Sequence, residues 1–163
     1  MITLIPMSNL EFQNYCQRAI AEYAHEHVRS GRWSAIEAVE QATREYQQLL
    51  PDGPTTPNHY LYTLHDPSTH AHVGMLWFAV REQAGQRSAF IYDVFIDPEF
   101  RRQGYATQTL QALENQVRAL GLATIGLHVF GHNHEARAMY EKLGYVPTNI
   151  LMTRFLEVNT SQA

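Results

Sequence analysis

The sequence predicts an α/β fold: a single domain in which a mixed central sheet of six or seven strands is flanked by four helices. The chain has 163 residues, of which 45% are hydrophobic, so it can bury a core of its own. Segments with alternating apolar residues are interleaved with segments that repeat at helical spacing. One stretch, Ile91–Leu110, combines a strand, a short basic loop and a helix, which is typical of α/β proteins.

The N-terminal part is predicted to hold a short strand and a first helix. Residues 2–5 are expected to form the strand, which Pro6 ends. A helix capped by Ser8 or Asn9 should run to about Val28. Its apolar residues recur every three or four positions and form one stripe: Phe12, Cys16, Ala19 and Tyr23. The single cysteine lies on this stripe, so we expect a core residue rather than a nucleophile.

A second helix is expected after Gly31. Ser34–Glu37 has the pattern of a capping box, in which the serine and glutamate side chains each bind an N-terminal amide. The helix should end at Pro51, and the following proline-rich loop is too short for a domain linker. The residues expected on its apolar side are Ile36, Val39, Thr43, Tyr46 and Leu50.

Three strands in a row follow. Alternating apolar residues predict strands at 59–65, 72–81 and 89–96. The turns between them, at 66–68 and 82–87, are short, so neighbouring strands should pair in antiparallel fashion.

The C-terminal part is predicted to add two helices and at least two strands. The first helix follows Gly104, and Gly121 is its expected C-terminal cap. Its apolar residues are Ala106, Leu110, Leu113, Val117 and Leu120. The remaining elements are a strand at 123–129, a helix at 134–143 capped by Gly144, a short strand near 145–147, a closing strand at 150–158 and a frayed tail at 159–163.

Composition excludes several classes of protein. The net charge of −4 argues against a nucleic-acid partner, which requires a basic surface. No apolar run approaches the roughly 18 residues that span a membrane, and Met1–Pro6 lacks the features of a signal peptide. One cysteine forms no intrachain disulfide, so we expect a reducing, cytoplasmic location.

The loop that follows the strand at 89–96 is predicted to bind phosphate. Asp97-Pro98 ends this strand, and Gly104 leads into a helix. This geometry directs backbone N–H groups and the positive end of the helix dipole toward one point, to which Arg101 and Arg102 add charge. The alternative is a strained turn that carries two solvated arginines.

Two motifs resemble those of a known family. Arg101-Arg-Gln-Gly-Tyr-Ala106 resembles the Arg/Gln-x-x-Gly-x-Gly/Ala signature of the GNAT superfamily of acyl-CoA-dependent N-acetyltransferases. About thirty residues later, Leu127–Asn133 and Ala136–Tyr145 look like the next strand and helix of that family. The resemblance covers about residues 59–157.

The resemblance implies an enzyme that transfers an acetyl group from acetyl-CoA directly to a primary amine, with CoA as product. Residues 59–158 would then form the acetyl-CoA-binding core, and residues 1–58 would supply a strand and the helices on the substrate side. The residues expected to contact the cofactor are Val94, Phe95, Ile96, Arg101, Arg102, Gln103, Gly104, Tyr105, Ala106, Thr107, Asn133, Ala136 and Tyr140. The acceptor would be a small molecule or a peptide, and an exposed sheet edge near the C-terminus would permit a homodimer.

The resemblance also implies which residue acts as the general acid. Tyr140 matches the tyrosine that protonates the leaving thiolate in many family members, and the alternative is an aromatic residue packed in the core. Asn133 matches an asparagine that contacts the cofactor, and it would also serve as a helix N-cap.

The general base is left with three alternatives. Asp93 shares a strand face with Phe95. His128 lies on the neighbouring strand, where similar ribosomal-protein acetyltransferases carry a glutamate, and an ordinary histidine pKa suits proton uptake at neutral pH. The third alternative is a water molecule that relays the proton, with no dedicated residue as the base.

Two other interpretations of the sequence, a metal site and a non-catalytic module, are also considered. Nine histidines suggest a metal, and six of them form the pairs His25/His27, His70/His72 and His132/His134, but no supporting motif accompanies these pairs, so no metal is expected. A non-catalytic module that binds or senses acyl-CoA is the alternative function, because a fold does not determine an activity.

Overall fold

The computed structural model describes residues 1–157, and these fall into two compact units, Met1–Phe130 and the part from Gly131 onward. The first unit contains a five-stranded sheet in the order β1-β2-β3-β4-β5, antiparallel except for the parallel pair β4 and β5. Its strands are β1 (Thr3–Pro6), β2 (His59–Asp66), β3 (Ala71–Gln83), β4 (Gln86–Ile96) and β5 (Ile125–Leu127). Its helices are α1 (Asn9–Arg29), α2 (Ala38–Leu49) and α3 (Tyr105–Ala119), with short 3₁₀ turns at Gly53–Thr55 and Pro98–Phe100.

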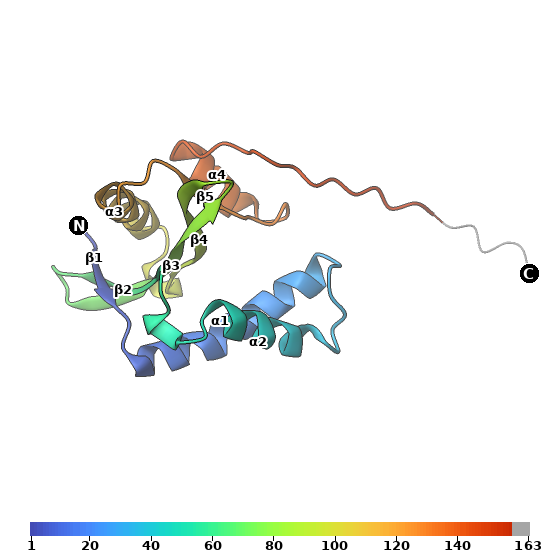
Figure 1. Cartoon of the computed structure of the whole chain (residues 1–163), viewed down its shortest axis with the longest axis horizontal. Coiled ribbons are helices and arrows are strands. Elements are labelled where there is room, and N and C mark those ends of the chain that lie inside the picture. The colour runs from blue at the N-terminus through green and yellow to red at the C-terminus, as the bar shows by residue number, and fades with distance from the viewer. Residues whose placement is uncertain (158–163) are drawn as a thin grey trace, which may run out of the picture. The chain divides into compact units, whose positions relative to one another are not determined.

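Both faces of the sheet are covered. Helices α1 and α2 lie side by side on one face, and α3 lies on the other (Figure 1). Alternation along β3 serves both layers, because Met75 and Trp77 pack with α1 and α2. The intervening Leu76 and Phe78 are fully buried. The α/β fold class that the sequence predicts is therefore confirmed.

The start of α1 matches the prediction. The Ser8 hydroxyl accepts a hydrogen bond from the Glu11 amide at 3.3 Å, and the Glu11 carboxylate accepts one from the Ser8 amide at 2.8 Å. The predicted stripe of Phe12, Cys16, Ala19 and Tyr23 packs into the core, together with the buried Tyr15.

The start and the buried side of α2 differ from the prediction. The expected capping box at Ser34–Glu37 does not form, since these residues precede the helix and Glu37 makes no side-chain cap. Ile36 and Val39, which were expected on the apolar side, are exposed. The buried side carries Ala38, Ala42 and Tyr46. Ala38 and Ala42 pack against Ala24 of α1, and such small side chains let two helices approach closely.

The sheet is smaller than expected. β5 is limited to Ile125–Leu127, and no strand forms within residues 128–157, so the predictions at 145–147 and 150–157 are wrong and the sheet has five strands rather than six or seven. Apolar residues of this stretch, including Ile150 and Phe155, are exposed. Alternation of apolar and polar residues predicts which side chains share a face of a strand. A segment also forms a strand only where the edge of a neighbouring strand is available for pairing. Val158 and the predicted tail at 159–163 lie outside the described residues.

The second unit contains α4 (His134–Lys142). It matches the predicted helix at 134–143 to within one residue. Gly144 follows in the left-handed conformation, with φ of 90°. Gly121 has φ of 71° and ends α3 in the same way, as the sequence predicts.

A β-bulge interrupts the pairing of β3 with β4. Trp77 pairs with Asp93 and Phe78 pairs with Ile91, so Tyr92 is an additional residue on β4. A bulge places two successive side chains on nearly the same side of a strand. The Tyr92 ring accordingly stacks on Trp77, with centroids 4.3 Å apart.

Close approach of two backbones holds the C-terminal end of β4. A Cβ atom on Gly74 of β3 would lie 2.0 Å from the Phe95 carbonyl oxygen, which is far inside contact distance. Only glycine therefore permits β3 to approach Phe95 and Ile96 this closely.

We expect Gly74→Ala to destabilise the protein by about 3 kcal/mol, because the backbone of β4 must shift to admit the methyl group. The melting temperature should fall by roughly 10 °C in a thermal unfolding experiment. Gly126→Ala is the matched control, since its Cβ would meet only the Phe90 ring at 3.6 Å. Equal stability of the two variants would contradict this account of Gly74.

Candidate active site

The loop after β4 has the geometry of an anion-binding turn. A 3₁₀ turn at Pro98–Phe100 leads to Arg102 with φ of 61° and to Gly104 with φ of 85°. Gly104 is the N-cap of α3. The first amides of any α-helix have no partner within the helix, so those of Tyr105, Ala106 and Thr107 are available to a ligand at its positive end.

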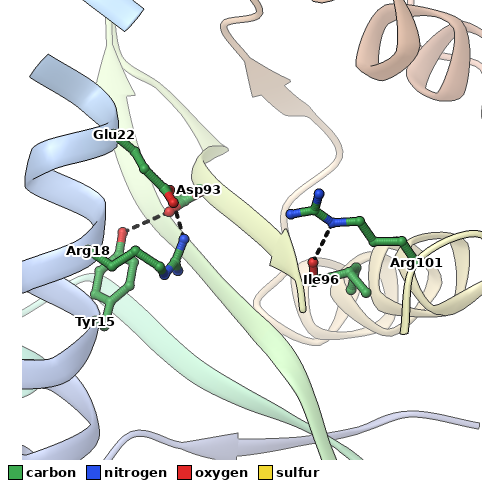
Figure 2. A network of polar contacts seen from close by, with 6 residues as sticks. All are labelled: Tyr15, Arg18, Glu22, Asp93, Ile96 and Arg101. Carbon is green, nitrogen blue, oxygen red and sulfur yellow. Dashed lines mark hydrogen bonds and ion pairs between the residues drawn. The ribbon is translucent and has the colours of Figure 1, made fainter. Parts of the chain in front are cut away.

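Side chains of the loop hold it in place. The Arg101 Nε donates a hydrogen bond to the Ile96 carbonyl at 2.9 Å (Figure 2). The Gln103 Nε2 donates to the Glu99 carbonyl at 2.9 Å. The sequence predicts Arg101 and Gln103 as cofactor contacts; in the structure both also brace the turn.

The N-terminus of α3 is tied to the turn between β2 and β3. The Tyr105 hydroxyl donates a hydrogen bond to Asp66 at 2.8 Å. Asp66 also accepts hydrogen bonds from the hydroxyl and the amide of Ser68, and these bonds hold the pKa of Asp66 well below its usual value. A carboxylate that is ionised at neutral pH thus anchors the N-terminus of α3.

The last part of β4 has an open edge. Within residues 1–157, β5 pairs with β4 only from Ala89 to Ile91, and the bulge at Tyr92 begins where this pairing ends. Val94, Phe95 and Ile96 are paired on their other side with β3. The open edge leads directly into the anion-binding turn, so an extended ligand with an anionic end could pair with this strand and reach the α3 amides.

Asp93 is a half-buried carboxylate on the face covered by α1. The Tyr15 hydroxyl donates a hydrogen bond to its Oδ2 at 3.1 Å (Figure 2). Burial raises the pKa of Asp93 to about 6, although the positive charge of Arg18 and the hydrogen bond from Tyr15 act in the opposite direction. A carboxylate with this pKa is ionised at neutral pH and accepts a proton readily.

Aromatic rings surround this carboxylate. Trp77 stacks on Tyr92, and the Tyr15 ring meets Trp77 edge-on at 6.4 Å. The Trp77 Nε1 donates to the His59 Nδ1 at 3.0 Å. Burial raises the pKa of Tyr15 and of Tyr46, so both hydroxyls remain protonated at neutral pH. Trp77 belongs to the core, and it pairs with Asp93 across β3 and β4.

His128 lies in different surroundings. Its ring meets Phe130 edge-on at 5.0 Å, and Phe130 in turn meets His27 near the end of α1. Burial, and then the charge of Arg32, lower the pKa of His128. Asp93 instead contacts Tyr15, which precedes His27 by about 18 Å along α1. The two candidate bases therefore lie near opposite parts of this helix.

The remaining predicted residues belong to the second unit. The Asn133 Oδ1 accepts a hydrogen bond from the Ala136 amide at 3.2 Å, so Asn133 is the N-cap of α4. Tyr140 is buried and meets Tyr145 edge-on, with centroids 5.4 Å apart. Both residues occupy the helix positions that the sequence predicts, and their catalytic and cofactor roles stay predictions.

Sequence reasoning missed the contributions of α1 to this site. Tyr15, Arg18 and Glu22 are spaced three and four residues apart, so they share a helix face. All three gather around Asp93 (Figure 2). The spacing is visible in the sequence, but nothing in it indicates that this face meets β4.

Across residues 1–157, histidine, cysteine, aspartate and glutamate side chains form no group of three that would hold a metal ion. No helix in this part of the chain is both long and apolar enough to cross a membrane.

The fold and the turn at the end of β4 define a class of enzyme. Residues 19–145 match the acetyltransferase (GNAT) family, so the chain belongs to that family and is an acyltransferase. The resemblance to the GNAT superfamily that the two sequence motifs indicate is therefore confirmed.

Particular relatives support this assignment. YycN of Bacillus subtilis strain 168, described as an uncharacterized N-acetyltransferase, is 37% identical over 155 residues, which are 95% of this chain and 99% of YycN. YdgE of the same strain, described in the same words, is 34% identical over 94% of this chain and 98% of its own length. The crystal structure of YycN matches with a TM-score of 0.90 at 36% identity, over 97% of this chain and all of YycN.

A shorter match has a named acceptor. The [ribosomal protein bS18]-alanine N-acetyltransferase of Haemophilus ducreyi is 39% identical over 57 residues, which are 35% of this chain and 39% of that enzyme.

We expect Asp93→Asn to stabilise the protein at neutral pH. The folded-state pKa of about 6 exceeds the ordinary aspartate value of 3.8, so ionisation of Asp93 opposes folding. This cost is absent below pH 4, grows between pH 4 and 6 and is complete above that range, where it amounts to about 3 kcal/mol. Urea unfolding at several pH values should show the variant gaining stability over the parent protein across this window.

The exposed Glu40→Gln is the control, and its effect on the free energy of unfolding should vary little over the same window. A stability difference for Asp93→Asn that is constant from pH 4 to 8 would show that Asp93 is not buried as described.

Proposed function

We propose that the protein transfers an acetyl group from acetyl-CoA directly to a primary amine. The observation that carries this proposal is the open edge of β4, which runs from Tyr92 into a turn with backbone amides directed at one point. The donor set fits the group: amides and arginines suit a pyrophosphate, and an open strand edge suits an extended amide chain. Membership of the GNAT family supports the same donor and an amine acceptor.

Residues of the turn and of β4 would hold the cofactor. The amides of Gly104, Tyr105 and Ala106 would bind the pyrophosphate, and Arg101 and Arg102 would add positive charge. The backbone of Val94, Phe95 and Ile96 would pair with the pantetheine arm. Acetyl-CoA, when bound, supplies a thioester carbonyl carbon that an amine can attack. Gln103, Thr107, Asn133 and Ala136 complete the predicted contacts.

Asp93 is the base that the proposal favours. Its ionised form would take the proton that the acceptor amine loses, directly or through a water molecule. The burial of this carboxylate, its pKa of about 6 and its hydrogen bond from Tyr15 support this role. His128 is the second candidate, since its lowered pKa keeps the ring neutral and able to accept a proton. The Tyr140 hydroxyl would donate a proton to the departing sulfur.

The proposal extends to the setting of the reaction. A cytoplasmic location suits an enzyme with one cysteine, which lies partly buried on α1. Exposed apolar residues of the C-terminal segment, among them Leu151 and Phe155, would favour pairing of two copies. Static light scattering would then report twice the 18.7 kDa of one chain.

Calorimetric titration with acetyl-CoA tests the phosphate-binding turn. We expect the protein to bind acetyl-CoA and Gly104→Val to lose that binding, because a β-branched residue at φ of 85° distorts the turn. Gly121→Val is the matched control: it imposes the same backbone strain at φ of 71°, at the other end of α3. Absence of binding by the unaltered protein would overturn the proposed donor.

Kinetics test the proposed acid. Tyr140→Phe should lower kcat by about 100-fold or more while the Kd for acetyl-CoA stays unchanged, since general acid catalysis acts on the chemical step. Tyr145→Phe removes a neighbouring hydroxyl from the same unit and should leave kcat within a few-fold. An equal loss of turnover and cofactor affinity in Tyr140→Phe would show that Tyr140 only supports the structure.

A further inference from the structure

We propose that the acceptor carries a carboxylate next to its primary amine, and that Arg18 binds this carboxylate. The inference rests on the proposed function and names the class of acceptor: amino acids, or peptides with an acidic N-terminal residue. It makes Arg18 the residue that determines acceptor specificity.

The position of Arg18 is the first argument. Its guanidinium lies 3.7 Å from the centroid of the Phe95 ring and 5.8 Å from that of Tyr15. Figure 2 shows Arg18 and Tyr15 both directed from α1 toward Asp93. Phe95 is one of the residues whose backbone would pair with the pantetheine arm, so the guanidinium lies beside the strand segment that would hold the donor. Stacking fixes its plane and leaves its N–H edge for a planar anion.

The charges around Asp93 are the second argument. Three charges act here: the carboxylates of Asp93 and Glu22 and the guanidinium of Arg18, which is paired with Glu22. An ammonium group alone is attracted by the two carboxylates and repelled by Arg18, and it offers Arg18 no partner in place of Glu22. An acceptor with its own carboxylate satisfies both groups, because its amine meets Asp93 and its anion meets Arg18.

The third argument concerns Glu22, the residue that Arg18 contacts in this structure. The Arg18 Nη1 contacts the Glu22 Oε2 at 2.8 Å, and 54% of the Glu22 side chain is exposed. Exposed pairs of this kind contribute little stability. A substrate carboxylate could replace Glu22 at small cost, so Glu22 shows the direction from which such a group would bind.

Matched acceptors test the proposal. Release of CoA thiol should be measured with each common amino acid and with its carboxamide, which has the same amine but no negative charge. To separate free amino acids from peptides, Asp-Ala amide is compared with Asn-Ala amide. We expect charged acceptors to exceed their neutral counterparts in kcat/KM by roughly 10- to 100-fold.

Variants assign the preference to Arg18. Arg18→Gln should abolish the ratio of charged to neutral acceptors, mainly through a higher KM for charged ones. Any change that this variant causes in the pKa of Asp93 affects both acceptors of a pair and cancels in the ratio. Glu22→Gln removes the competing carboxylate and should lower KM for charged acceptors. Arg44→Gln, which breaks an exposed pair with Glu40 on α2, is the control and should keep the ratio.

The outcomes separate this inference from the proposed function. Equal or better use of the carboxamides, or an unchanged ratio in Arg18→Gln, would overturn the carboxylate class while acetyl transfer stands. Binding of acetyl-CoA without transfer to any charged acceptor would overturn it as well. A protein that neither binds acetyl-CoA nor releases thiol would overturn the proposed function itself.

Discussion

The bulge at Tyr92 is the constraint on which the rest of the site depends. One additional residue in β4 coincides with the end of its pairing with β5, so the strand gains an open edge. The same residue turns its ring onto Trp77, next to Asp93. Gly74 then holds the strand against β3 beyond the bulge. A single irregularity thus lies beside both a strand edge that would pair with the donor and a half-buried carboxylate that would meet the acceptor.

Burial of Asp93 connects stability with function. An ionised carboxylate among aromatic rings is unfavourable, as its raised pKa shows. The fold retains it with a hydrogen bond from Tyr15 and the nearby charge of Arg18, which recover only part of the cost. A core selected only for stability would place an apolar or amide side chain here, so the retained charge favours a catalytic role.

Much of the fold was accessible from the sequence, because it depends on local signals. The Ser8 cap, the glycine caps at 121 and 144 and the alternation along β3 all act within a few residues, and each prediction is confirmed. The capping box at Ser34–Glu37 failed because packing of small residues on α1 and α2 decides where that helix begins. The prediction of a closing strand was wrong because alternation of apolar residues does not show which strand of the sheet the segment would pair with. Arg18 was missed because only the tertiary fold brings its helix face to β4.

The donor-binding part and the acceptor-binding part of the proposed site constrain the sequence in different ways. The donor side uses backbone amides and a strand edge, so its function requires turn geometry and glycine at few positions and tolerates varied side chains elsewhere. The acceptor side uses side chains from α1, where Tyr15, Arg18 and Glu22 surround one carboxylate. A change at Arg18 would alter the charge that the acceptor meets without disturbing the strand that holds the donor. The proposed site therefore separates the common step from the choice of acceptor, which one face of one helix would decide.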